Sequence, residues 1–246
     1  MKKCVTIEDG VRAVLDVYRH TPTVEWELIP AAEGELVDHI LLDGEKYPLF
    51  WWRFDTQVAE LCALAPERKL CSMKLNRSCS KADGLERLMY KEFDIAENVF
   101  RSKIEKVMCF KNENALNMLA TMKNERVAVF ELSAALNENT PEQGRHIYWG
   151  QDGMASDRVV SQKVASEAIY LFTEDEEKPA VYNDIFIYMY GLNKTDATKA
   201  EAIAEILMGR IDISDWHQRD AHYRSCIAAA EESARAVKRV TVKEEV

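Results

Sequence analysis

The chain has 246 residues, 47% of them hydrophobic and 9% aromatic, which suits one large domain or two modest ones and argues against disorder. Its formal net charge of −10 argues against non-specific binding to nucleic acid or to an anionic membrane, since both need a basic surface. No apolar run approaches the roughly 20 residues that span a bilayer, and no hydrophobic leader opens the chain, so we predict a cytoplasmic protein.

Short helices and extended segments alternate in the first third of the chain. A proline follows each helix, Pro22 after the first and Pro66 after the second, and proline ends helices because it lacks an N–H. The periodicity of residues 34–42 favours neither a helix nor a strand that turns at Asp43-Gly44, so both stay open. The predicted elements here are helices at 6–18 and 56–64, an extended segment at 24–29 and a strand at 70–75.

The stretch from residue 104 to residue 160 predicts the centre of the fold. It consists of short apolar or alternating runs between polar clusters, a pattern typical of successive antiparallel strands. Helix-forming sequence lies on both sides and can cover one face of the sheet. We therefore predict an α+β fold with a predominantly antiparallel, open-faced sheet covered by helices on one side. The strands are expected at 104–110, 116–122, 127–133, 145–149 and 168–172, and the helices at 84–100, 182–192, 196–208 and after Asp215.

The six cysteines do not form a metal-binding pattern. None belongs to a Cys-x-x-Cys pair, and the closest two, Cys71 and Cys79, have seven residues between them. We predict free, mostly buried thiols and no metal site, since a zinc site is expected to show close ligand pairs.

Two surface features have both a functional and a structural interpretation. His217 and His222, with nearby aspartates, form the densest histidine and carboxylate cluster, which is either an acid/base or metal site or the polar start of a helix. Trp51 and Trp52 either stack on a sugar ring or belong to the core. The sequence contains no Gly-x-Ser-x-Gly elbow and no P-loop.

The C-terminal third carries a family resemblance. The run Cys226-Ile-Ala-Ala-Ala-Glu-Glu-Ser-Ala-Arg235, followed by residues 238–242, resembles the closing signature of the glucose–fructose oxidoreductase/inositol dehydrogenase/MocA family. In that family a helix ending in A-x-x-S-x-R-x-G-K leads into a final short strand, and Val237 stands where the glycine is usual. The run 145–153 is similar to the family's mid-sheet I-x-G-x-x-G hairpin.

Earlier segments follow the same family in order and spacing across nearly the whole chain. Glu45-Lys46-Tyr47-Pro48 is similar to its E-K-P motif with Tyr47 inserted, and residues 73–77 contain the Asn-Arg pair that comes after it. Residues 16–22 are similar to the strand ending in D-V-x-x-x-T-P that precedes E-K-P. The resemblance implies cofactor contacts from Thr21, Pro22, Glu45 and Arg77.

The departures from the family concern the nucleotide and the catalytic histidine. The sequence lacks the G-x-G-x-x-G turn, and only fifteen residues precede Asp16, so residues 1–77 are expected to be a truncated, degenerate α/β segment that is partly Rossmann-like, before a C-terminal domain at 78–246. The histidine of the family's D-x-x-x-H motif falls on Lys91, and Asp94 matches a later aspartate. Lysine is a poor general base at neutral pH, and Lys46, from E-K-P, is the catalytic lysine that the resemblance retains.

Three hypotheses follow. The first, which we prefer because of the missing glycines and Lys91, is a degenerate relative that needs no cofactor and acts as a binding partner. It would form a homo-oligomer through the open sheet of residues 104–172 or pair with a full-length paralogue, and would bind no nucleic acid or membrane. The second is an active NAD(P)-dependent oxidoreductase that uses Lys46 on a sugar or polyol. The third is an unrelated α+β enzyme that uses His146, His217 or His222.

Overall fold

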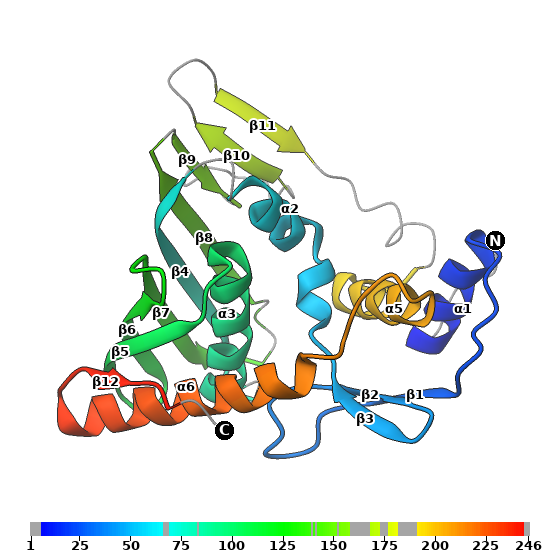
Figure 1. Cartoon of the computed structure of the whole chain (residues 1–246), viewed down its shortest axis with the longest axis horizontal. Coiled ribbons are helices and arrows are strands. Elements are labelled where there is room, and N and C mark those ends of the chain that lie inside the picture. The colour runs from blue at the N-terminus through cyan, green and yellow to red at the C-terminus, as the bar shows by residue number, and fades with distance from the viewer. Residues whose placement is uncertain are drawn as a thin grey trace. The chain divides into compact units, whose positions relative to one another are not determined.

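The computed structural model (Figure 1) describes part of the chain and divides it into two compact units. The first unit is Met1–Ala59 with Asn183–Asp220, and the second is Glu60–Tyr182 with Ala221–Val246. No helix in the part of the chain that is described has both the length and the apolar character needed to cross a bilayer. The described residues are 6–65, 69–82, 84–138, 140, 142–151, 153–157, 168–172, 177–181 and 191–243.

The first unit contains a small sheet and two helices that pack together. Strands β1 (Trp26–Ile29), β2 (His39–Leu42) and β3 (Glu45–Pro48) form an antiparallel meander. Helix α1 (Ile7–Val17) packs on α5 (Lys194–Leu207), and a Cβ at Gly10 would lie only 3.0 Å from the Ala200 Cβ of α5, so the close approach favours glycine. The remaining elements are η1 (Trp51–Phe54) and the start of α2 (Thr56–Leu64).

The turn at Asp43-Gly44 settles the open choice for residues 34–42 in favour of a strand. Both turn residues have positive φ, 48° for Asp43 and 88° for Gly44. This is the backbone of a two-residue hairpin turn, for which Asp-Gly is a favoured sequence. The pairing of this sheet is antiparallel throughout, whereas a Rossmann unit pairs its strands in parallel.

The second unit contains a sheet of nine strands in the order β11-β10-β9-β8-β4-β7-β6-β5-β12. Neighbouring strands are antiparallel except β4 and β7, which are parallel. The strands are β4 (Leu70–Ser80), β5 (Ile104–Lys111), β6 (Ala115–Met122), β7 (Val127–Leu136), β8 (Gln143–Gly150), β9 (Gly153–Ser156), β10 (Ala168–Phe172), β11 (Glu177–Val181) and β12 (Val240–Thr241).

Two helices cover one face of this sheet. Helix α3 (Leu85–Phe100) packs against β4, β6 and β7, with Phe93 and Phe130 in edge-to-face contact. Helix α6 (Trp216–Ala236) lies beside α3 (Figure 1). The part of α6 that belongs to the second unit contacts β5 through a hydrogen bond to Ser233. Along β6 and β7, residues that face the helices are buried and alternate with more exposed residues. The predicted α+β class, with an antiparallel sheet covered on one side, is therefore confirmed.

Most predicted elements appear close to their expected limits, including the central strands and the helices around them. The predicted helix at 182–192 lies outside the described residues, except for 191 and 192. The predicted division after residue 77 is a single cut, whereas each compact unit is built from two segments of the chain. The cysteines that the structure describes are free thiols, as predicted: Cys62, Cys71, Cys79, Cys109 and Cys226.

The serine of the C-terminal signature has a clear structural role. The Ser233 hydroxyl accepts a hydrogen bond from the Cys109 backbone N–H at 2.9 Å and donates one to the Lys238 carbonyl at 2.6 Å. It therefore ties the end of α6 to β5 and guides the chain into β12. Between them, Val237 has φ of 48°, the left-handed conformation that glycine adopts without strain.

Replacing Val237 by glycine is expected to stabilise the second unit. A left-handed residue with a Cβ costs about 1–2 kcal/mol, although glycine also gives the unfolded chain more freedom, so a net gain of about 1 kcal/mol is expected. The side chain is 63% exposed, so little packing is lost. Urea unfolding followed by circular dichroism measures the change. Val237→Ala keeps the Cβ and should gain less, and a Val237→Gly variant less stable than the native protein would contradict the prediction.

Candidate functional site

The predicted catalytic lysine of the first unit is held in a surface ion pair. Lys46 lies on β3, and its Nζ donates a hydrogen bond to Glu35 Oε1 at 2.8 Å. This hydrogen bond and a second one from the Ala32 N–H lower the pKa of Glu35 to about 2. The Lys46 side chain is 41% exposed, so the pair contributes little to stability.

The predicted cofactor residues of the first unit do not form one group of contacting side chains. Thr21 is exposed and Pro22 half-buried, both in the loop after α1. Glu45 begins β3 and lies 3.8 Å from His217 Nε2, while the ring of Tyr47 lies 4.9 Å from that of His217. His217 is therefore an exposed residue beside the hairpin.

The other predicted residues, Arg77, Lys91 and Asp94, belong to the second unit. Glu142 brings two of them together, because its Oε1 accepts from Arg77 Nη1 at 2.6 Å and from Lys91 Nζ at 3.1 Å. Asp94 is fully buried and instead accepts a hydrogen bond from the Tyr223 hydroxyl at 2.7 Å. Arg77 and Lys91 thus share a partner, and Asp94 links α3 to α6.

Arg77 and Lys91 are part of a larger set of charged side chains, which we call the buried ion network. Arg77 Nε lies 2.7 Å from Glu92 Oε1, and Glu92 is fully buried on α3. His146 of β8 contacts Glu92 and Asp157 with its two ring nitrogens, at 2.8 and 2.7 Å. With His146 protonated the network balances three positive and three negative charges, carried by Arg77, Lys91, His146, Glu92, Glu142 and Asp157.

The geometry favours a cationic His146. Each ring nitrogen lies within 2.8 Å of a carboxylate oxygen, which only accepts hydrogen bonds. The donor Arg77 Nη2 lies farther away, 3.2 Å from Nε2 and 3.4 Å from Nδ1, so the shorter contacts favour a hydrogen on both nitrogens. Burial alone would lower the pKa of His146, but the charges of Glu92 and Asp157 outweigh it and raise the pKa to about 9. His146 is therefore charged at neutral pH and unsuited to act as a general base there.

Glu92 is held in its ionised form by the same contacts. Burial would raise the pKa of Glu92, yet the charges of Arg77 and His146 lower it to about 2. Gly144 of β8 allows Arg77 to reach this position, since a Cβ at residue 144 would lie 3.0 Å from Arg77 Cγ and 2.9 Å from the Asn76 carbonyl oxygen. The network is thus a fixed arrangement of ions beneath the sheet.

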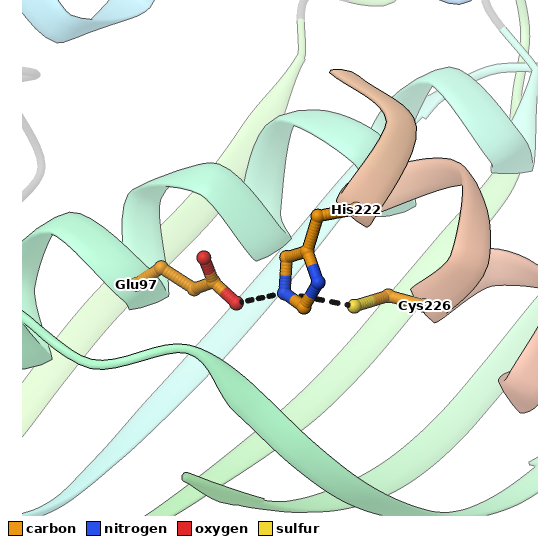
Figure 2. A group of neighbouring side chains, drawn as sticks. All are labelled: Glu97, His222 and Cys226. Carbon is orange, nitrogen blue, oxygen red and sulfur yellow. Dashed lines mark hydrogen bonds and ion pairs between the residues drawn. The ribbon is translucent and has the colours of Figure 1, made fainter. Parts of the chain in front are cut away.

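A second buried group, the His–Cys–Glu cluster, consists of Glu97, His222 and Cys226 (Figure 2). Glu97 comes from α3, and the other two lie four residues apart on α6, so both point to one side of that helix. Nε2 of His222 lies 2.7 Å from Glu97 Oε1 and 3.5 Å from Cys226 Sγ. Burial, and after it the charge of Glu97, raises the pKa of the Cys226 thiol well above its usual value.

A pocket of about 260 Å³ adjoins this cluster, with His222 in its wall. Its other lining residues come from β5, from the turn after β6 and from the C-terminal strand: Ile104, Glu105, Lys123, Thr241 and Val242. His222 and His217, which the sequence grouped together, are thus in different surroundings, one buried in α6 and the other exposed beside β3.

Solved structures resemble this chain over much of its length. An oxidoreductase from Agrobacterium radiobacter in complex with NAD+, L-tartaric acid and magnesium matches with a TM-score of 0.62 and 11% identity, over 97% of this chain and 70% of its own. A levoglucosan dehydrogenase in complex with NADH and L-sorbose matches with a TM-score of 0.62 and 11% identity, over 98% of this chain and 71% of the dehydrogenase. A scyllo-inositol dehydrogenase from Lactobacillus casei with bound NAD(H) and scyllo-inositol matches with a TM-score of 0.56 and 12% identity, over 78% of this chain and 63% of the dehydrogenase.

The chain shares its fold with these solved oxidoreductases. These structures are oxidoreductases of the kind that the sequence motifs resemble. Their sequence identities to this chain are so low that the match establishes the fold alone. The chain covers 63% of a Thermotoga maritima oxidoreductase and 64% of a dehydrogenase from the same organism. No protein-family model and no curated protein matches the sequence.

The sequence pointed to some members of these clusters and missed others. His146 and His222 were candidates, but Glu92, Glu97, Glu142 and Asp157 were not, because a carboxylate on a helix or loop is ordinarily solvated. One usable signal was overlooked, namely the spacing of four residues between His222 and Cys226 on a helix. Their partner Glu97 lies 125 residues away in sequence, and no local pattern could have paired them.

Proposed function

We propose that this chain is a non-catalytic relative of the sugar and polyol dehydrogenases and acts as a binding or oligomeric partner. The observation that supports the proposal is the pairing of Lys91, which stands where the resemblance places the general acid/base histidine. Its ammonium group donates to Glu142, which also binds Arg77. An ammonium group that donates hydrogen bonds has no lone pair with which to take a proton from a substrate hydroxyl.

The other residue that supports this proposal is Arg77, which the resemblance assigns to the cofactor. Its guanidinium group is directed into the buried ion network, toward Glu92 and Glu142, and is therefore not available to bind a nucleotide phosphate. In this interpretation the chain uses the residues at the former catalytic positions to stabilise its fold. The G-x-G-x-x-G motif is also missing from this sequence, which supports the same proposal.

The partner that we propose is a second copy of this chain, bound through the open face of the sheet. Met108, Leu119 and Val129 lie side by side on neighbouring strands and face away from α3 and α6. On the same face, Phe110 is 57%, Leu119 41% and Trp149 39% exposed. Exposed apolar side chains of this kind mark interaction surfaces, and a two-fold axis would let this one pair with itself.

A cofactor titration tests the non-catalytic assignment. The five tryptophans can serve as energy-transfer donors to bound NADH or NADPH, and we expect no saturable binding up to about millimolar cofactor, the weak end of the affinity range. A levoglucosan dehydrogenase measured in parallel provides the positive control. Saturable micromolar binding together with turnover of a sugar or polyol would overturn the proposal and favour the active oxidoreductase with Lys46.

Light scattering tests the partner. The native protein is expected to be a dimer at micromolar concentration, and Leu119→Lys is expected to give a monomer because it places a charge in the centre of the proposed interface. Val17→Lys is the matched control, since Val17 is a comparably exposed apolar residue on α1 of the first unit. A monomeric native protein would count against a homo-oligomer and leave the paralogue as the partner to seek.

A further inference from the structure

The His–Cys–Glu cluster brings three kinds of metal-binding atom together inside the second unit. A carboxylate oxygen, an imidazole nitrogen and a sulfur lie within 4.8 Å of one another, and all three residues are buried. Figure 2 shows the His222 ring between the other two side chains, with both interactions made by the same edge of the ring. Neither these residues nor this position is part of the buried ion network.

The hydrogen bond between His222 and Glu97 leaves the Cys226 sulfur with only a weak contact to the same ring nitrogen. If Nε2 of His222 carries a hydrogen, it donates to Glu97 and has no lone pair with which to accept from the Cys226 thiol. If Nε2 is unprotonated, its lone pair faces an oxygen of Glu97 at 2.7 Å, which is repulsive. The structure gives Cys226 no hydrogen-bond partner other than His222 among the described residues. A cation placed between the three atoms would satisfy all of them.

The nitrogen–sulfur distance matches a tetrahedral metal site, and the nitrogen–oxygen distance comes close to one. Zn–N and Zn–S bonds of about 2.0 and 2.3 Å place the nitrogen and sulfur roughly 3.5 Å apart, and the observed separation is 3.5 Å. The nitrogen and oxygen would have to separate from 2.7 Å to roughly 3.3 Å, which small side-chain rotations can provide. With a thiolate and a carboxylate as ligands, a divalent ion also leaves the buried site without net charge.

We propose that Glu97, His222 and Cys226 bind a divalent transition-metal ion, Zn2+ by the chemistry of its donors. A set of one sulfur, one nitrogen and one oxygen suits Zn2+, whereas Mg2+ and Ca2+ require oxygen ligands. Three protein ligands leave a fourth position for water, which the adjoining pocket at His222 can supply.

The surroundings would hold the ligands in place. The Ile104 backbone N–H donates to Glu97 Oε1 at 2.6 Å, which fixes the carboxylate, and that oxygen keeps a second lone pair for the metal. His222 and Cys226 are on one helix, so their separation is set by the backbone. A bound ion would therefore join α3 to α6 next to the first residues of β5.

Cobalt binding to the metal-free protein tests the site. Protein treated with a chelator and dialysed is titrated with Co2+ and followed by absorption, because thiolate ligation gives a near-ultraviolet charge-transfer band and tetrahedral geometry gives strong visible bands. We expect one ion per chain and displacement of Co2+ by Zn2+. His222→Gln and Cys226→Ser are each expected to weaken binding by at least about tenfold, and the serine variant to lose the charge-transfer band.

Two matched controls separate this site from other groups on the chain. His217→Gln changes an exposed histidine on the same helix, and Cys71→Ser removes an exposed thiol on β4, so neither should alter the titration. An absence of saturable Co2+ binding in the native protein would overturn the proposal. So would an unchanged charge-transfer band in a folded Cys226→Ser variant, because the sulfur would then come from another cysteine.

Discussion

Replacing Arg77 by methionine is expected to lower the free energy of unfolding of the second unit by about 3–5 kcal/mol. Methionine has a similar volume, so the main loss is the positive charge. Without that charge the buried Glu92 and its neighbour Glu142 lose their strongest partner, and a buried carboxylate that is not compensated is costly. Urea unfolding followed by circular dichroism measures the effect, provided that the variant is compared with the native protein at the same pH.

Lys238→Met provides a control in the same unit. Lys238 also pairs with a glutamate, Glu232, at 3.8 Å, but its side chain is 62% exposed and water screens the pair. We expect a loss below about 1 kcal/mol for this variant. Equal losses from Lys238→Met and Arg77→Met would show that burial of the ion network does not determine its contribution.

The stability of the second unit is expected to fall as the pH rises from about 6.5 to about 9. His146 has an ordinary pKa of 6.5, and in the folded protein the pKa is raised to about 9, so folding favours the protonated ring. Its contribution is fully present below pH 6.5 and is lost as the pH rises through 9. For one proton the steepest slope is about 1.4 kcal/mol per pH unit. Urea unfolding at a series of pH values measures this slope.

The acid side has the opposite sign. The pKa of Glu92 is lowered from 4.5 to about 2, so its contribution is present above pH 4.5 and is lost as the pH falls toward 2. The double variant His146→Gln and Asp157→Asn removes the titrating ring together with one of its carboxylate partners. The double variant should flatten the dependence of the unfolding free energy on pH between about pH 6.5 and 9. A slope unchanged from that of the native protein would mean that groups other than His146 cause the dependence.

The central sheet was predictable because its signal is local. Strands β5 to β8 alternate inward and outward side chains over short runs, and polar turns separate them, so each could be located without its neighbours. The Asp43-Gly44 pair also indicated a hairpin turn, although the periodicity of residues 34–42 was equally compatible with a helix. The pairing of β4 with β7 in parallel was not predictable, since it depends on the whole sheet.

The buried charges were harder to predict than the strands. Glu92, Asp94 and Glu97 all face the interior of the second unit from α3, although isolated charges on a helix are ordinarily solvated. Their partners come from β4, β8 and α6, so only the folded chain brings the opposite charges together. A histidine and a cysteine four residues apart on a helix are a weaker sign of a metal site than a close cysteine pair, so the sequence did not predict a group formed by His222 and Cys226.

The late position of α6 and β12 in the chain has a consequence for synthesis. Ser233 reaches back 124 residues to Cys109, and β12 then pairs with β5 at the edge of the large sheet. Until residues 233–241 leave the ribosome, β5 has an edge with unpaired backbone groups, and such edges recruit other chains. This segment therefore caps an edge that is synthesised well before it, and a nascent chain stalled before residue 233 would be prone to aggregate.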